Sequence, residues 1–97
     1  MITENFTIKV IDLGFGINLA GRNQDGFNRT KLGAESYMAP EMLAKKSYQG
    51  QDIDIFSFGT MILVLSLFCF PFKDASMDDV GYNYLCKQPD IFWASFE

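Results

Sequence analysis

The chain has 97 residues, of which 48% are hydrophobic, 15% aromatic and 21% charged, and its net charge at pH 7 is −4. This length allows one small domain with a thin core, and the composition is that of a globular protein. With no histidine and no basic stripe, the sequence excludes Ser-His-Asp catalysis and predicts no nucleic-acid partner. Ten phenylalanines need more burial than 97 residues supply, so part of the apolar surface is expected to face something outside this chain.

The first third of the chain predicts one strand followed by a long loop. Residues 6–11 alternate and are rich in β-branched types, which predicts a strand ending at Asp12, where Gly14 and Gly16 break the pattern. Residues 18–36 show no period. A loop of this length is uncommon in a compact domain, which favours a regulatory or binding role.

Two helices are predicted next. Pro40 suits the first position of a short helix that runs to about Lys45. A second helix, capped by Asp52 or Asp54, is predicted over residues 55–70, and Pro71 ends it. Its interior holds no charge and is apolar on every face, so we expect it to be buried.

The C-terminal part predicts one further helix and an aromatic tail at residues 91–97. Ser76, with Asp79 three residues later, indicates a capped helix that runs to about Lys87. Gly81 within it costs about 1 kcal/mol of helix stability relative to alanine.

Cys69 and Cys86 lack the spacing of a metal site or a disulfide framework. They are expected to be two buried free thiols. No basic segment followed by an apolar stretch opens the chain, so a reducing, cytoplasmic location is predicted.

Three phrases stand in one order: Asp12-Leu13-Gly14, the run Gly-Ala-Glu-Ser-Tyr-Met-Ala-Pro-Glu at 33–41, and Asp-Ile-Phe-Ser-Phe-Gly at 54–59. Their order and spacing resemble the metal-binding loop, the end of the activation segment and the central helix of a eukaryotic-type protein kinase C-terminal lobe. Residues 71–75 and 92–93 extend the resemblance, which is greatest to calmodulin-dependent and related kinases. It implies a mainly α fold: a partial kinase-like C-lobe over residues 1–97, with a short N-terminal strand or hairpin and a long irregular activation segment.

The resemblance makes Asp12 the candidate metal ligand, and Asp12 with Gly14 the candidate cofactor-binding residues. In the family the matching aspartate coordinates a Mg²⁺ that bridges the ATP phosphates. A carboxylate suits this role because Mg²⁺ prefers oxygen ligands. The alternative is an aspartate that caps a turn after a strand.

Thr30 is the candidate phosphosite of the activation segment, because it stands three residues before Gly33. The alternative is an ordinary surface threonine, and Ser36 is a weaker candidate of the same kind. Ala34 occupies the place of a threonine whose hydroxyl helps to position the substrate in Ser/Thr-specific kinases. Alanine cannot make that hydrogen bond, which implies lower activity, different substrate contacts or a scaffold role.

The resemblance also assigns structural roles to Ala39, Pro40, Glu41, Asp54 and Gly59. In the family the residue matching Glu41 pairs with an arginine late in the lobe. An unpartnered carboxylate is costly to bury, so Glu41 is expected to stay hydrated in this chain. The residue matching Asp54 binds backbone amides of the catalytic loop, a role compatible with a plain helix cap.

These features predict a segment of a protein Ser/Thr kinase whose parent uses ATP and Mg²⁺ to transfer the γ-phosphate to hydroxyls of a protein substrate. The sequence contains no glycine-rich loop, ATP-positioning lysine or catalytic aspartate motif, so we assign no catalytic residue within it. The chain alone is expected neither to bind ATP tightly nor to catalyse transfer.

Two alternatives stay open. One is a non-catalytic, pseudokinase-like module that binds another protein, or the rest of a kinase, through its exposed apolar surface. The other is a single-pass membrane protein in which residues 55–72 span the bilayer. Ser57, Gly59, Thr60, Ser66 and the acidic flank disfavour the membrane alternative.

Overall fold

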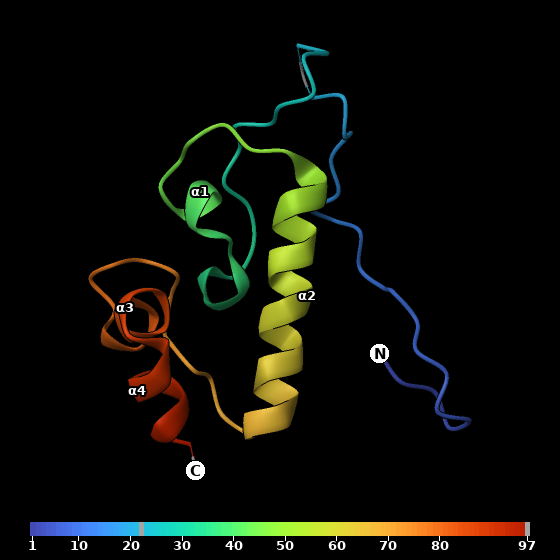
Figure 1. Ribbon diagram of the computed structural model, residues 1–97. Helices are drawn as coiled ribbons and strands as arrows, with labels where there is room; N and C mark the ends of the chain where they lie inside the picture. Colours follow the sequence, from blue (N-terminus) through green and yellow to red (C-terminus); the bar gives the residue numbers. More distant parts are fainter. Residues whose placement is uncertain (22, 97) are drawn as a thin grey trace.

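The computed structural model describes residues 1–21 and 23–96, and it is mainly helical, as predicted. The elements are a 3₁₀ helix η1 (Glu35–Tyr37) and the α-helices α1 (Pro40–Leu43), α2 (Gly50–Leu67), α3 (Val80–Lys87) and α4 (Pro89–Ala94). Helix α2 is the longest helix of the molecule (Figure 1). Helices α1, α3 and α4 lie on one side of α2, and the N-terminal segment lies on its other side and runs away from it (Figure 1).

The predicted strand over residues 6–11 is wrong in detail. The described residues form no strand, and the N-terminal hairpin is reduced to one antiparallel bridge between Ile2 and Ile8. Phe6 interrupts the extended run with a φ of 60°, and both Phe6 and Val10 are more than 80% exposed. A two-stranded hairpin with no packed face is marginal in water, which explains why pattern alone does not produce a strand here.

Helix α2 starts and ends earlier than predicted. It begins at Gly50, after Gln49 in the cap position, so Asp52 and Asp54 lie inside the helix and neither is the N-cap. It ends at Leu67, and the C-cap residue Phe68 adopts the left-handed conformation and donates its N–H to the Val64 carbonyl at 2.9 Å. A left-handed residue is a common way to satisfy a helix C-terminus, and here it acts before Pro71 is reached.

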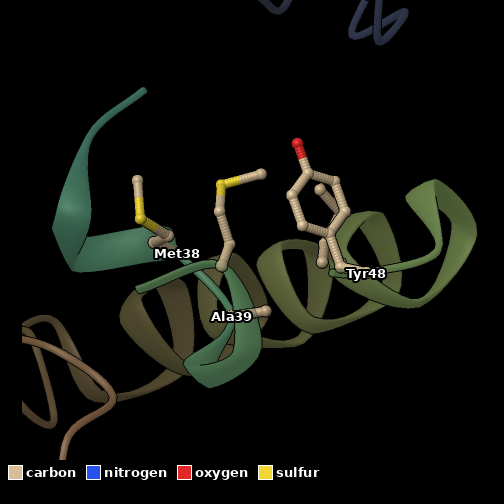
Figure 2. Packing of buried hydrophobic residues seen from close by; sticks show 5 residues of the cluster. Met38, Ala39 and Tyr48 are labelled. Carbon is tan, nitrogen blue, oxygen red and sulfur yellow. The ribbon is translucent and has the colours of Figure 1, made fainter. Parts of the chain in front are cut away.

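The main core is a cluster of five buried residues: Met38, Ala39, Met42, Tyr48 and Ile53. Figure 2 shows the two methionine side chains and the Tyr48 ring side by side above the helices. The residues come from α1, its flanks and the first turn of α2, so the cluster fastens α1 to the N-terminal end of α2. A core of this size supplies little hydrophobic stabilisation.

The predicted burial of the apolar helix is wrong for this chain. Much of the surface of α2 is left uncovered by the other described residues, and Ile55, Phe58 and Leu65 are each more than half exposed. The molecule measures 44 × 39 × 16 Å and has a radius of gyration of 15.2 Å. A compact domain of this length would have about 13 Å, so the elements are spread out rather than wrapped around α2.

Helix α3 ends at Lys87 as predicted, but its cap differs. Asp79 is the N-cap and accepts the Tyr82 N–H at 2.9 Å, whereas Ser76 lies before the helix. The other carboxylate oxygen of Asp79 accepts the Lys73 N–H, also at 2.9 Å. Residues 91–94 of the predicted aromatic tail belong to helix α4, in which Phe92 is buried, and residue 97 lies outside the described residues.

Both cysteines are free, as predicted, but the prediction that they are buried is wrong. Cys69 and Cys86 are exposed. Cys69 follows the end of α2 and Cys86 lies on α3, and neither residue belongs to the buried cluster beside α1.

Replacing Asp79 with alanine is expected to lower the free energy of unfolding by about 1–2 kcal/mol, at the upper end of N-cap losses. The reason is that this carboxylate satisfies two backbone N–H groups, one in α3 and one in the preceding link. Urea unfolding followed by circular dichroism measures the change. The matched control is Asp78→Ala, since Asp78 is exposed and is not the cap; equal losses for the two variants would contradict the assigned cap.

Candidate functional site

An open groove of about 420 Å³ lies between the irregular segment and the first turns of α2. Asp54 and Ser57 line it from α2, and Ala39 lines it from the end of the irregular segment. Ser57 donates its hydroxyl to the Tyr37 carbonyl at 2.8 Å. This bond ties η1 directly to α2. One wall of the groove is therefore formed by the motif at residues 54–59, and another by the motif at residues 33–41.

The Asp12-Leu13-Gly14 motif lies outside the lining of this groove. Residues 15–19, which follow Asp12 closely, contribute Phe15, Gly16 and Leu19 to the groove lining, whereas Asp12 and Gly14 do not line it. Leu19 packs against Gly50, because a Cβ at position 50 would lie 2.6 Å from the Leu19 side chain. The structure therefore brings the segment after Asp12, and not Asp12 itself, next to Asp54 and Ala39.

Asp12 and Gly14 form a small exposed turn. Asp12 has a φ of 60°, and its Oδ1 accepts the Gly14 N–H at 3.3 Å. A Cβ at position 14 would lie 3.2 Å from that oxygen, so glycine keeps the carboxylate uncrowded. Within residues 1–21 and 23–96, no group of three or more cysteine, aspartate or glutamate side chains is placed so that it could hold a metal ion. One exposed carboxylate fits Mg²⁺, which usually takes one or two protein carboxylates and completes its shell with phosphate and water.

Thr30 is exposed and lies between two cationic side chains that already have acidic partners. Arg29 pairs with Asp25 at 2.9 Å, and Lys31 pairs with Glu35 at 2.9 Å. The Phe27 N–H and the Arg29 guanidinium lower the pKa of the Asp25 carboxyl. Surface pairs of this kind are weak, so a phosphate on Thr30 would compete for both cations at little cost.

Ala34 is exposed at the start of η1, and Ser36 lies half-buried within it. Ala34 lines the groove but offers only a methyl group there. The Ala39 side chain is buried and Pro40 opens α1, so these two residues hold the end of the segment in place. Gly59 has open space around the position of a Cβ, and no close approach in this structure requires a glycine there.

Glu41 lies half-buried on a second open groove of about 520 Å³ between α1 and the link before α3. Pro40 and Tyr82 line the same groove. Burial raises the pKa of Tyr82 to about 12, helped by a hydrogen bond and charge repulsion from Cys86 and by the Glu41 charge. No salt bridge to Glu41 occurs among the described residues.

The stability of the chain is expected to fall as the pH rises from about 10 to about 12. Tyr82 keeps its proton in the folded state up to a pKa of about 12, whereas the unfolded value is near 10.0, so folding favours the protonated phenol and loses this contribution in that window. Urea midpoints measured at several pH values test this, with Tyr82→Phe as the comparison. The variant should show a shallower decline; an identical decline in both proteins would contradict the shift.

Two residues of this region were missed by sequence reasoning. Ser57 had one available signal, since it is a polar residue in an otherwise uncharged apolar run. Tyr48 had none: it follows the predicted short helix in the sequence, yet it is 2% exposed and its hydroxyl donates to the Thr30 carbonyl.

Comparison with known proteins identifies relatives along the whole chain. Residues 1–96 match the protein kinase domain family. The chain is 38% identical over 97 residues to CBL-interacting serine/threonine-protein kinase 5 of Arabidopsis thaliana, covering 100% of this chain and 20% of the relative. It is 38% identical over 77 residues to CBL-interacting protein kinase 28 of Oryza sativa subsp. japonica, covering 79% of this chain and 18% of the relative.

A third relative is CBL-interacting protein kinase 11 of Oryza sativa subsp. japonica, 33% identical over 87 residues, which cover 90% of this chain and 17% of the relative. The chain thus spans about a fifth of the length of these curated relatives. No solved structure matches it.

Proposed function

Because this chain belongs to the protein kinase domain family, we propose that it serves as the C-lobe segment of a protein Ser/Thr kinase that transfers the γ-phosphate of ATP to protein hydroxyls. The observation that carries the proposal is the match over residues 1–96, which includes all three phrases. The bond from Ser57 to the Tyr37 carbonyl supports it, since it holds the end of the activation segment (residues 14–41) against α2.

Asp12 would hold Mg²⁺ in this function, and Gly14 would keep its carboxylate accessible. The metal supplies charge neutralisation of the ATP phosphates when bound. The chain's own contribution is position: the Gly14 N–H orients one carboxylate oxygen and leaves the other for a ligand. One carboxylate is too little for tight nucleotide binding, so the 97-residue chain alone is proposed to be inactive.

A segment-exchange experiment tests the kinase function. Residues 1–97 replace the aligned segment of the Arabidopsis relative that matches over 97 residues, and transfer of phosphate from ATP to a generic protein substrate is measured. The chimera is expected to be active. Asp12→Asn in the chimera should reduce kcat by at least about 100-fold, because a transition-state charge contact is lost.

Asp25→Asn is the matched control, because Asp25 is an exposed carboxylate of the same segment that pairs only locally with Arg29. It should leave kcat within about twofold, as surface ion pairs contribute little. A soluble, folded chimera with no activity would contradict the kinase proposal. Phosphoryl transfer by the 97-residue chain alone, abolished by Asp12→Asn, would contradict its proposed inactivity.

A second candidate function is a non-catalytic interaction module, which Ala34 and the exposed face of α2 favour. The discriminating variant is Ala34→Thr in the chimera. If the segment belongs to an active kinase, a threonine at this position should leave kcat unchanged or raise it. An inactive chimera that Ala34→Thr restores would instead favour a segment that has lost catalysis.

We also propose that α2 belongs to a cytoplasmic protein rather than to a membrane. Helix α2 (Gly50–Leu67) is long and apolar enough to cross a bilayer, with a mean hydropathy of 1.3 and 11% of it buried. Against a spanning role, Ser57 donates to the Tyr37 carbonyl of η1 and Thr60 is buried, so one face of α2 contacts other parts of the protein. Carbonate extraction separates the two: recovery of the chain in the membrane pellet would contradict the proposal.

A further inference from the structure

Tyr48 joins the buried cluster to residues 28–30, which lie 18 to 20 positions earlier in the sequence. Its backbone N–H and C=O exchange two hydrogen bonds with Asn28, both 2.8 Å long. Its ring belongs to the buried cluster with Met42, and Figure 2 shows the hydroxyl pointing away from Ala39. That hydroxyl donates to the carbonyl of Thr30.

The two attachments lie at the candidate phosphosite Thr30 and two residues before it, at Asn28. Asn28 and Thr30 are two residues apart, and both bond to the residue that precedes the N-cap of α2. Asn28 is itself buried, and its Nδ2 donates to the Asn18 carbonyl at 3.1 Å. The backbone of residues 28–30 is therefore fixed to the folded core, while the Thr30 side chain remains exposed.

The hydroxyl contributes more than the ring to this attachment. A buried phenol that loses its partner leaves an unsatisfied donor in an apolar setting, so the bond to Thr30 is favoured whenever the ring is in place. Burial also raises the pKa of Tyr48, which favours the protonated form of the donor. The ring by itself would hold the cluster together without reaching the activation segment.

We infer that Tyr48 is a positioning residue that clamps the activation segment at Thr30, with its hydroxyl controlling the local opening of residues 28–31. The meaning of this clamp for regulation rests on the proposed function, in which Thr30 is a phosphate acceptor. The clamp itself is a property of the 97-residue chain. It presents the Thr30 side chain to solvent at a fixed place beside Arg29 and Lys31.

Limited proteolysis of the Tyr48→Phe variant tests the clamp. Trypsin cleaves after Arg29 and after Lys31, which flank Thr30. Because cleavage follows the population of the open segment, both bonds should be cut about five- to tenfold faster when the hydroxyl is absent. Cleavage after Lys73, outside this segment, should be unchanged.

Tyr82→Phe is the matched control, since it removes a second partly buried phenol that lies on α3. It should leave cleavage after Arg29 and Lys31 unchanged. Tyr48→Phe cleavage that is accelerated equally at all sites would show global loosening and overturn the clamp. Unchanged cleavage at both flanking bonds would overturn it as well.

Hydrogen exchange of the unmodified chain gives a second test that does not depend on a variant. The amide hydrogens of Asn28 and Tyr48 should exchange at least about tenfold more slowly than in an unstructured peptide, since each is bonded to the other residue's carbonyl. Unprotected amides at these two positions would overturn the clamp even if Tyr48→Phe fails to fold. An inactive segment-exchange chimera would leave both results standing, so the two proposals fail separately.

Discussion

Replacing Gly81 with alanine is expected to destabilise the chain, although helix propensity alone predicts a gain of about 1 kcal/mol. A Cβ at position 81 would clash with the Pro71 carbonyl oxygen and would lie 3.4 Å from the Phe72 Cβ. The nearest atom belongs to the backbone and cannot rotate away. Overpacking of this kind costs about 1–3 kcal/mol, so the net free energy of unfolding should fall in urea titrations.

Gly59→Ala is the matched control, because Gly59 also lies inside a helix. A Cβ at position 59 meets nothing within 4 Å, so alanine there should stabilise the chain by about 0.5–1 kcal/mol through helix propensity. Opposite signs for the two substitutions are the expected result. Stabilisation by both alanines would show that α3 does not approach Pro71 as closely as the structure places it.

Replacing Met42 with alanine should lower the free energy of unfolding more than Gly81→Ala does. Met42 is 7% exposed in a cluster of five buried residues, and truncating a buried methionine costs about 2–5 kcal/mol. A domain of this length has a total stability of only about 5–15 kcal/mol. We expect loss of the cooperative urea transition, or a midpoint shifted far towards zero urea.

Met77→Ala is the matched control, because it truncates a methionine that does not belong to the buried cluster. Met77 is 51% exposed, so its truncation should change the free energy of unfolding by less than about 0.5 kcal/mol. Similar losses for Met42 and Met77 would contradict the assignment of the core to the junction of α1 and α2. A large loss for Met42 alone would support it.

The helix boundaries show where the local sequence pattern is enough to predict the start or end of a helix. Pro40 starts α1 and Lys87 ends α3, as predicted, because a proline at the first helical position and a basic last turn act within a single turn of backbone. The start of α2 was misplaced because Asp52 and Asp54 look like caps in the sequence. Leu19, 31 positions before Gly50, packs against that glycine, and no local pattern reports such a contact.

The candidate site divides in the same way. The Asp12-Leu13-Gly14 turn is local: one side chain accepts the N–H two residues ahead, so sequence is enough to predict it. The contact from Tyr48 to Thr30 crosses 18 positions and the contact from Ser57 to Tyr37 crosses 20. None of these four residues is a carboxylate or a glycine, the residue types that mark a candidate site in the sequence.

The sequence by itself determined the family, the order of the three phrases and the helical character of the chain, because these depend on residue types at short, fixed spacings. Only the tertiary structure decided which side of α2 is covered, which residue caps α3, what surrounds Gly81 and which hydroxyl holds Thr30. The physical reason is that burial, close approach and long-range hydrogen bonds depend on where separate segments meet, and that meeting is decided by packing across the whole chain.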